Sequence, residues 1–218
     1  NLALNYSQIF VKDSEKLPAM SGVEYRTKLK PGTKPIRRKL RRYTPAERKS
    51  CWSEVSKMIE DGVIEPGHGP WAANCVFVPK PDGSLRQCVN YTGVNKCTIF
   101  DSYPIPNQTE QLIRLKGCNY MFSCDAWSGF WQIPIPEEER DVLAFITPFG
   151  LFRPTRMMFG GCNNAQVFQR ALNQKFEDLI INDTVNIYID DISGGRSDWD
   201  QFINDLTQVF QRCKDEHI

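Results

Sequence analysis

Two adjacent carboxylates interrupt an apolar stretch near the end of the chain. They are Asp190 and Asp191, within "TVNIYIDDISGG" at 184–195. Aspartate is depleted in strands, and a buried carboxylate without a partner costs several kcal/mol. Successive side chains of a strand point to opposite faces, so both acids can serve one cation only at the tip of a hairpin. The segment therefore predicts either a metal-binding hairpin or a turn in which the aspartates serve only the backbone.

A third carboxylate, Asp125, ends another predicted strand, "NYMFSCD". Mg²⁺ prefers oxygen ligands, and phosphoryl-transfer sites often hold two ions about 3.5 to 4 Å apart. Acids at two strand ends predict such a site. The simpler alternative is that Asp125 caps the turn "DAWSGF".

Composition narrows the chemistry that the chain can perform. His68 and His217 are the only histidines, which argues against a histidine-built metal site or a Ser-His-Asp triad. The eight cysteines include no CxxC pair, and we expect reduced, mostly buried thiols. No apolar run reaches the roughly 18 residues of a membrane span, and no signal peptide begins the sequence, so we predict an intracellular location without membrane contact.

Charge is distributed unevenly along the chain. Residues 1–60 hold fourteen Lys/Arg against six Asp/Glu, although the net charge of the whole chain is +1. The basic end includes "PIRRKLRR" at 35–42. Such a run is either a solvated surface or a contact with a phosphate backbone.

Periodicity and turn residues predict a mixed α and β chain with mostly antiparallel strands. A capping box at Thr44 predicts a helix over 45–61, with Trp52, Val55 and Ile59 on its buried face. Two strands with a turn at Pro81–Gly83 predict a hairpin at 75–91. Further helices are expected near 107–116, over 164–179 and after Ser197 as cap, and their apolar stripes are more typical of core than of ligand sites.

Four ordered blocks of sequence carry a family resemblance. They are "GPWAANCVFVPKPDGSLRQCVNYTGVNK", "FSCDAWSGFWQIPI", "FGGCNNAQVFQRALN" and "YIDDIS". Residues 22–214 thereby resemble reverse transcriptases of gypsy-type long-terminal-repeat retrotransposons and of their retroviral and pararetroviral relatives. The resemblance implies an RNA-directed DNA polymerase with an α+β right-hand fold of fingers and palm, a mostly antiparallel palm sheet packed on helices, and no thumb.

The resemblance also implies how the chain is divided. An N-terminal extension is expected at 1–21 and the fingers at 22–116. The palm is expected at 117–218, with further fingers residues at about 136–165 and the catalytic hairpin at 184–196.

Asp125, Asp190 and Asp191 match the family's catalytic and metal-binding carboxylates. They would hold two Mg²⁺ ions, for which Mn²⁺ is a possible substitute, and activate a primer 3′-hydroxyl for in-line attack on the α-phosphate. Phe130 falls where the family places an aromatic that would collide with a ribose 2′-hydroxyl and so select deoxynucleotides. Its alternative role is that of a core residue beside Trp131.

Lys80 and Arg86 match fingers residues that close on the incoming triphosphate. The alternative for Lys80 is a solvated charge on the hairpin. Phe159 and Gly160 match the loop beneath the nucleotide, where a flat apolar surface and a free backbone allow close approach. The remaining assignments are Gln169 for the nucleotide site, and Tyr188, Arg38 and Arg41 for the primer and template.

The match is weaker at three places. After the hairpin, Asn90 and Thr92 stand where the family commonly has an acid and an arginine, so an anion that would brace the fingers is missing. Met158, Gly161 and Ala165 stand where the family commonly has Pro, Leu and Pro, which predicts a looser nucleotide loop. The four residues after Lys214 leave no room for a primer-gripping hairpin, a thumb or a ribonuclease H domain, and no Met begins the chain. We therefore expect a segment of a longer polyprotein, completed by those regions or by a second subunit.

The expected partners are an RNA or DNA template with its primer and deoxynucleoside triphosphates, in the cytoplasm, a virus-like particle or the nucleus. A second hypothesis is a non-catalytic reverse-transcriptase-like module, domesticated or truncated, that binds nucleic acid or a protein. A metal nuclease on an unrelated fold would share the acids but leave Lys80, Arg86 and Phe130 without roles.

Overall fold

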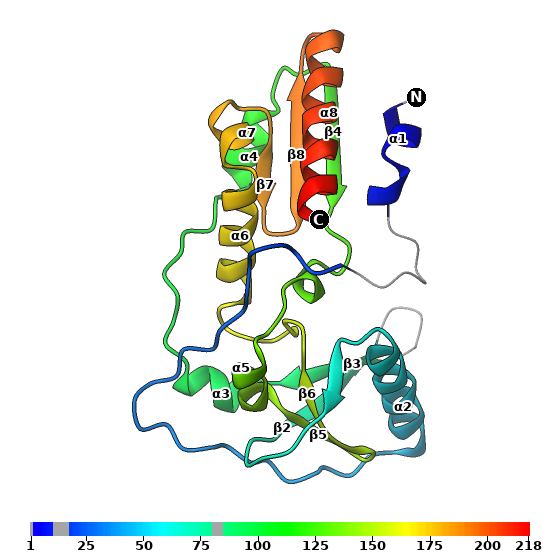
Figure 1. Cartoon of the computed structure of the whole chain (residues 1–218), viewed down its shortest axis with the longest axis vertical. Coiled ribbons are helices and arrows are strands. Elements are labelled where there is room, and N and C mark those ends of the chain that lie inside the picture. Colours follow the sequence, from blue (N-terminus) through cyan, green and yellow to red (C-terminus); the bar gives the residue numbers. More distant parts are fainter. Residues whose placement is uncertain (1, 11–17, 80–84) are drawn as a thin grey trace. The chain divides into compact units, whose positions relative to one another are not determined.

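The computed structural model describes residues 2–10, 18–79 and 85–218 (Figure 1). The chain forms two compact units, each assembled from separate segments. Unit 1 comprises Asn1–Val23, Asp101–Gln132 and Ala165–Ile218, and unit 2 comprises Glu24–Phe100 and Ile133–Asn164. Residues 101–116, which the resemblance assigned to the fingers, group with unit 1 and its expected palm residues.

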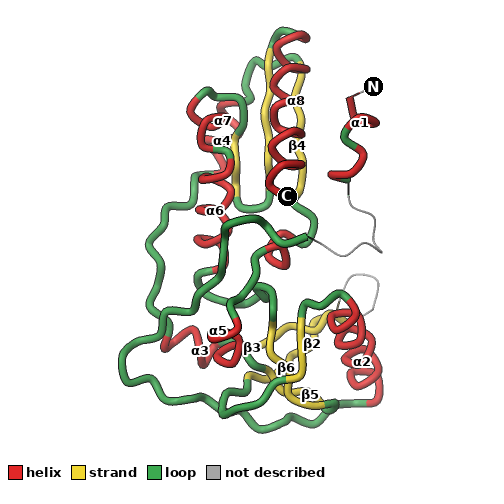
Figure 2. The backbone as a smooth tube through the Cα atoms, in the orientation of Figure 1, coloured by secondary structure: helices red, strands yellow, loops and turns green. Residues whose placement is uncertain are grey.

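Unit 2 is built on a five-stranded sheet with the strand order β1-β6-β5-β2-β3. Its neighbouring strands are antiparallel except for β2 and β5, which run parallel. The strands are β1 (Ile64–Pro66), β2 (Ala73–Pro79), β3 (Leu85–Asn90), β5 (Phe145–Thr147) and β6 (Gly150–Pro154). The helices are α2 (Pro45–Glu60), α3 (Thr92–Cys97), α5 (Glu137–Arg140) and the 3₁₀ turn η3 (Asp141–Leu143) (Figure 2).

The start of α2 has the predicted local chemistry. The Thr44 hydroxyl accepts a hydrogen bond from the Glu47 amide at 3.2 Å, and the Glu47 carboxylate accepts one from the Thr44 amide at 2.8 Å. Pro45 occupies the first helical position, where its missing N–H costs nothing. These contacts satisfy amides that the first turn leaves without helical partners.

The buried face of α2 differs from the predicted one. Cys51, Val55 and Met58 are buried, whereas Trp52 and Ile59 are 52% and 41% exposed. Val55 lies on both the predicted and the observed face, whereas the residues that flank it on the buried face, Cys51 and Met58, each precede the predicted residue by one position.

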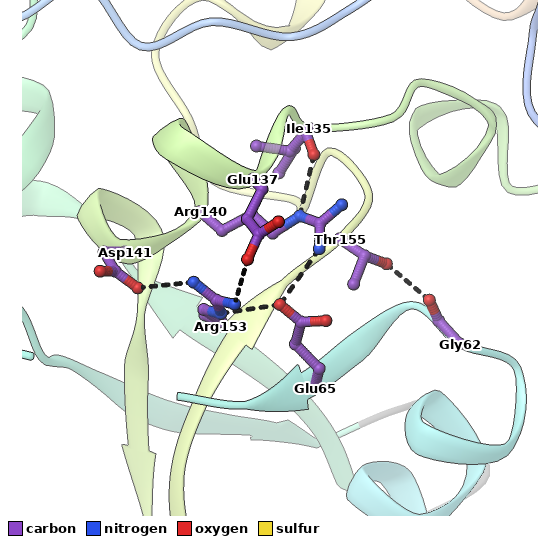
Figure 3. Close-up of polar contacts among 8 residues, drawn as sticks. All are labelled: Gly62, Glu65, Ile135, Glu137, Arg140, Asp141, Arg153 and Thr155. Carbon is purple, nitrogen blue, oxygen red and sulfur yellow. Dashed lines mark hydrogen bonds and ion pairs between the residues drawn. The ribbon is translucent and has the colours of Figure 1, made fainter. Parts of the chain in front are cut away.

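Ion pairs tie the edge strand β1 to the rest of unit 2 (Figure 3). The Arg153 guanidinium on β6 lies 2.7 Å from Glu65 of β1, 3.2 Å from Asp141 and 3.4 Å from Glu137. Arg140 reaches the same Glu65 at 3.1 Å. One carboxylate on a three-residue strand thus joins two arginines from different elements, which fixes the edge of the sheet.

Unit 1 contains a three-stranded antiparallel sheet with the order β4-β8-β7. Helix α8 packs against β4 and β8, and α4 contacts β7 (Figure 1). The strands are β4 (Tyr120–Asp125), β7 (Asn186–Tyr188) and β8 (Asp191–Arg196). The helices are α1 (Leu2–Asn5), η1 (Ser7–Ile9), α4 (Gln108–Arg114), η2 (Gly129–Gln132), α6 (Asn164–Lys175), α7 (Glu177–Ile181) and α8 (Trp199–Glu216).

Two details of these helices correct the prediction. The expected helix over 164–179 is broken at Phe176, whose backbone leaves the helical region between α6 and α7. The cap of α8 is Asp198, which accepts from the Gln201 amide at 2.9 Å. Ser197 instead donates its hydroxyl hydrogen to the Gly117 carbonyl at 3.0 Å.

Gly194 lets β8 pack closely on its neighbours. A Cβ at this position would lie 2.7 Å from both the Phe122 ring and the Thr184 carbonyl oxygen. Because backbone cannot move aside as a side chain can, this point of the sheet requires glycine.

All eight cysteines are free thiols, but fewer are buried than expected. Burial raises the pKa of Cys51 to about 11 and that of Cys213 to about 12, so both stay protonated at neutral pH. Cys75 is also buried, and the other five are half-buried. In the described part of the chain, no helix is both long and apolar enough to cross a membrane.

Candidate active site

Asp125, Asp190 and Asp191 meet at one end of the unit 1 sheet. Asp125 is the last residue of β4 and pairs with Asp191, the first residue of β8. The Ala126 amide donates to the Asp190 carbonyl at 2.9 Å, which fixes the turn against the end of β4. Facing residues of antiparallel strands have Cα atoms about 4.5 to 5.5 Å apart, so this register brings acids distant in sequence together.

The hairpin turn lies one residue earlier than predicted. Tyr188 pairs with Asp191, so the two loop residues are Ile189 and Asp190 rather than the two aspartates. All three carboxylates belong to exposed residues. The side chain of Asp190 therefore extends from the turn itself, whereas that of Asp191 extends from the first residue of β8.

The three acids influence one another electrostatically. The pKa of Asp125 is raised, first by partial loss of hydration and then by the negative charges of Asp190 and Asp191. The ion pairs found among the described residues all involve other acids. A cation near these carboxylates would relieve their repulsion.

As the side chains stand, no group of three or more His, Cys, Asp or Glu residues in the described ranges is arranged as a metal site. Mg²⁺ is usually held by one or two carboxylates together with substrate phosphates and water, rather than by a complete protein cage. The donor set of exposed carboxylate oxygens is the chemistry that such an ion prefers.

Phe130 lies in the 3₁₀ helix η2, a few residues after Asp125. Its half-buried ring packs edge-on against the buried Phe168 of α6, with centroids 5.6 Å apart. A Cβ on the preceding Gly129 would lie 2.5 Å from the Phe168 ring, so only glycine fits there. The Phe130 ring is thus supported by Phe168 and is still partly exposed.

Gln169 is placed differently from the assignment to the nucleotide site. Its side chain is fully buried on α6. Its Oε1 accepts from the Ile189 amide at 2.7 Å, and its Nε2 donates to the Ile187 carbonyl at 3.2 Å. In this arrangement it contacts the hairpin from within unit 1 and presents no surface to a nucleotide.

The loop around Phe159 and Gly160 belongs to unit 2. Phe159 is 53% exposed, and Gly160 has a φ of +101°. Asn95 of α3 donates to the Gly160 carbonyl at 2.8 Å and accepts from the Cys162 amide at 3.1 Å. These bonds hold the backbone of the loop on either side of Gly161.

Two arginines of the basic run have different surroundings. Arg38 is exposed, and its backbone amide donates to the Ala72 carbonyl at 2.8 Å. The Arg41 guanidinium forms an ion pair with Glu47 at 3.1 Å, so its positive charge is partly neutralised within the fold.

Three further residues were predicted for the site. Tyr188 ends β7 half-buried, opposite Asp191. Lys80 lies outside the described residues, and Arg86 lies on β3 with a side chain outside the described part.

Residues 78–218 match the family described as reverse transcriptase (RNA-dependent DNA polymerase). The chain belongs to this family. The chain is 29% identical over 195 residues to the enzymatic polyprotein of cauliflower mosaic virus (strain CM-1841), covering 88% of the chain and 28% of that polyprotein. It is 33% identical over 171 residues to the retrovirus-related Pol polyprotein from transposon 297 of Drosophila melanogaster, covering 76% of the chain and 16% of that polyprotein.

A solved foamy viral protease-reverse transcriptase in complex with RNA/DNA hybrid has the same fold. Its TM-score is 0.88 at 18% identity, over 99% of this chain and 28% of that chain. The predicted family and the α+β fold of fingers and palm type are thereby confirmed. This reverse transcriptase family chain spans less than a third of the length of these relatives.

The hydrogen bonds that Asn95 and Gln169 make to nearby backbone groups could not be predicted from the sequence. A buried amide must find hydrogen-bond partners, but its residue type does not say which backbone groups those are. The only available signal was the position of Gln169 inside an apolar helical stripe, next to Phe168.

Proposed function

We propose that this chain is the catalytic portion of an RNA-directed DNA polymerase. It would transfer deoxynucleotides to a primer 3′-hydroxyl as an RNA or DNA template directs. The observation that carries the proposal is the convergence of Asp125, Asp190 and Asp191 at adjoining strand ends, where partial loss of hydration and then the charges of its neighbours raise the pKa of Asp125. A binding module would gain nothing from carboxylates that repel one another.

Asp125 and Asp190, with Asp191 beside them, would hold two Mg²⁺ ions, and Mn²⁺ could replace them. Such ions lower the pKa of the attacking hydroxyl and offset the charge that develops on the phosphates. The protein's own part is to fix the carboxylates through the pairing of β4 with β8 and the bond from Ala126 to Asp190.

The other predicted residues fit positioning roles. Phe130 would exclude a 2′-hydroxyl, and its packing on Phe168 supports this because a steric barrier must be rigid. Lys80 and Arg86 would contact the triphosphate. Phe159 would lie beneath the nucleotide, where the bonds from Asn95 hold its loop.

Nucleic acid is the proposed macromolecular partner. Solved relatives include foamy viral enzymes in complex with an RNA/DNA hybrid and with double-stranded DNA. The exposed Arg38 suits contact with a template backbone. Additional regions or a second subunit would complete the grip on the duplex.

The test is extension of a DNA primer on an RNA template, with Mg²⁺ and deoxynucleoside triphosphates. We expect Asp190→Asn to abolish addition and to leave binding of the primer–template nearly intact, because it removes a ligand charge without altering the fold. Asp200→Asn, an exposed acid on α8, is the control and should extend normally.

Equal extension by the parent and by Asp190→Asn would refute the proposal. Binding of the hybrid without extension by either protein would favour the non-catalytic module.

A further inference from the structure

The geometry points to Gln169 as the residue that positions the catalytic hairpin. We infer that its side-chain amide holds the turn between β7 and β8 and thereby sets where Asp190 and Asp191 stand. This inference rests on the proposed function, because it assigns those two acids to catalysis. Gln169 is accordingly a positioning residue that acts through the hairpin.

The turn needs support because its backbone is strained. Ile189 has a φ of +53°. Asp190, the second loop residue, is not among the described non-glycine residues that have a positive φ. A two-residue hairpin loop with a positive φ only at its first position follows the type II′ pattern, in which glycine normally stands. A β-branched residue in this region is an outlier that persists only where its surroundings hold it.

Gln169 pairs with the outer edge of β7 as a neighbouring strand would. β7 is an edge strand, bonded on one side to β8. On its other side, the Ile187 carbonyl accepts from Gln169 Nε2, and the Ile189 amide donates to Gln169 Oε1. One side-chain amide therefore supplies a donor and an acceptor to the two backbone groups on either side of Tyr188.

These partners fix the orientation of the amide. A backbone amide can only donate and a carbonyl can only accept, so Oε1 must face Ile189 and Nε2 must face Ile187. Asn173, one turn further along α6, accepts a second bond from Nε2 at 2.9 Å and donates to the Tyr103 hydroxyl at 2.9 Å. The amide is held from behind and cannot rotate away without breaking this chain.

Two substitutions separate the parts of this contact. Gln169→Met keeps the length of the side chain but removes the amide group, so it loses both the bond to the Ile187 carbonyl and the bond from the Ile189 amide. Gln169→Glu keeps an acceptor for Ile189 but places a buried charge against the Ile187 carbonyl. We expect both to release the turn, and Gln174→Met on an exposed position of the same helix serves as the matched control.

The first measurement is independent of activity. Hydrogen exchange of the Ile189 amide should become on the order of tenfold faster in Gln169→Met, because its bond is lost. Exchange in α8 should not change. Unaltered exchange at Ile189, or uniform acceleration through all of unit 1, would overturn the inference.

The second measurement is primer extension by the full chain. A loss of roughly 100-fold in kcat with little change in the nucleotide KM is expected, as for misplacement of a catalytic group by about 1 Å. Replacing the strained residue, Ile189→Gly, in the Gln169→Met background should restore part of kcat, since glycine needs no support in this turn. A double variant no better than Gln169→Met would contradict the positioning role.

The two measurements distinguish this inference from the proposed function. If the parent does not extend primers but Gln169→Met still frees the Ile189 amide, the assignment of catalysis fails and the support of the turn stands. If the parent extends primers and Gln169→Met does so equally well, the positioning role fails and the proposed function stands.

Discussion

The pKa of the Asp125 carboxyl is raised by partial loss of hydration and then by the negative charges of Asp190 and Asp191 at the same end of the sheet. When the pKa of a carboxyl is higher in the folded state than in the unfolded state, the protonated carboxyl contributes to the stability of the fold at low pH. That contribution is lost as the pH rises through the pKa of the folded state. At about pH 7, Asp125→Asn should therefore raise the melting temperature, because it removes repulsion from Asp190 and Asp191. Near pH 3, below the ordinary carboxyl range, the difference should vanish.

Thermal unfolding followed by circular dichroism measures this effect, with Asp200→Asn as the control. Addition of Mg²⁺ should raise the melting temperature of the parent more than that of Asp125→Asn. A difference that persists at low pH would show that the cause is not the carboxylate charge.

In the proposed function, selection of the sugar rests on a single side chain, that of Phe130. We expect Phe130→Ala to accept ribonucleotides, lowering the discrimination between deoxynucleotides and ribonucleotides by roughly 10- to 100-fold, because the barrier is steric. Primer extension with each nucleotide class gives the ratio of the two kcat/KM values. Phe130→Tyr, which keeps the ring, should discriminate as the parent does, and a Phe130→Ala variant that still rejects ribonucleotides would remove this role.

At single residues, the sequence indicates which side chains have suitable chemistry, whereas packing decides where each of them lies. The family places acids at 125, 190 and 191, and the β4–β8 register then brings them together. By contrast, Gln169 was assigned to the nucleotide site from the family position that it matches, and the sequence alone does not distinguish a buried amide from an exposed one. Its burial follows from contacts with a hairpin about twenty residues further along the chain.

At the scale of elements, the close packing of β8 on its neighbours restricts which residues the fold accepts at position 194. Gly194→Ala should lower the stability of the fold by about 1 to 3 kcal/mol, the usual effect of overpacking, since the new methyl would meet Phe122 and the Thr184 carbonyl. Urea unfolding measures the change, and Ser193→Ala on the adjacent position is the control. Wild-type stability in Gly194→Ala would mean that the sheet can yield at this point.

Elements with local signals were predicted closely. The capping box of Thr44 and Glu47 specified the start of α2, because its partners are only three residues apart. The break at Phe176 was missed because Phe176 and Leu179 are both buried and continue the apolar spacing across it. The turn at Ile189 was missed for a different reason, since a β-branched residue with positive φ contradicts local preference and depends on a distant side chain.

At the scale of the whole molecule, charge separates along the sequence. The basic run lies in unit 2, and the first sixty residues carry the excess of positive charge. Binding of an RNA/DNA hybrid should therefore weaken steeply with salt. Arg38→Ala should reduce the slope of log K against log salt by about 1, which titration at several salt concentrations would measure.

Arg26→Ala is the control for this titration, because Arg26 already pairs with Glu24 and Glu138. An unchanged slope in Arg38→Ala would exclude Arg38 from the contact with phosphate.

The pairing of β4 with β8 also has a consequence for biosynthesis. Residues 126–190 lie between Asp125 and Asp191, and all of them must be translated before β4 can acquire its partner. At ordinary rates of elongation this interval lasts roughly 3 to 13 s, during which β4 has no strand beside it. The nascent polypeptide is consequently a candidate client for ribosome-associated chaperones until β8 emerges from the exit tunnel.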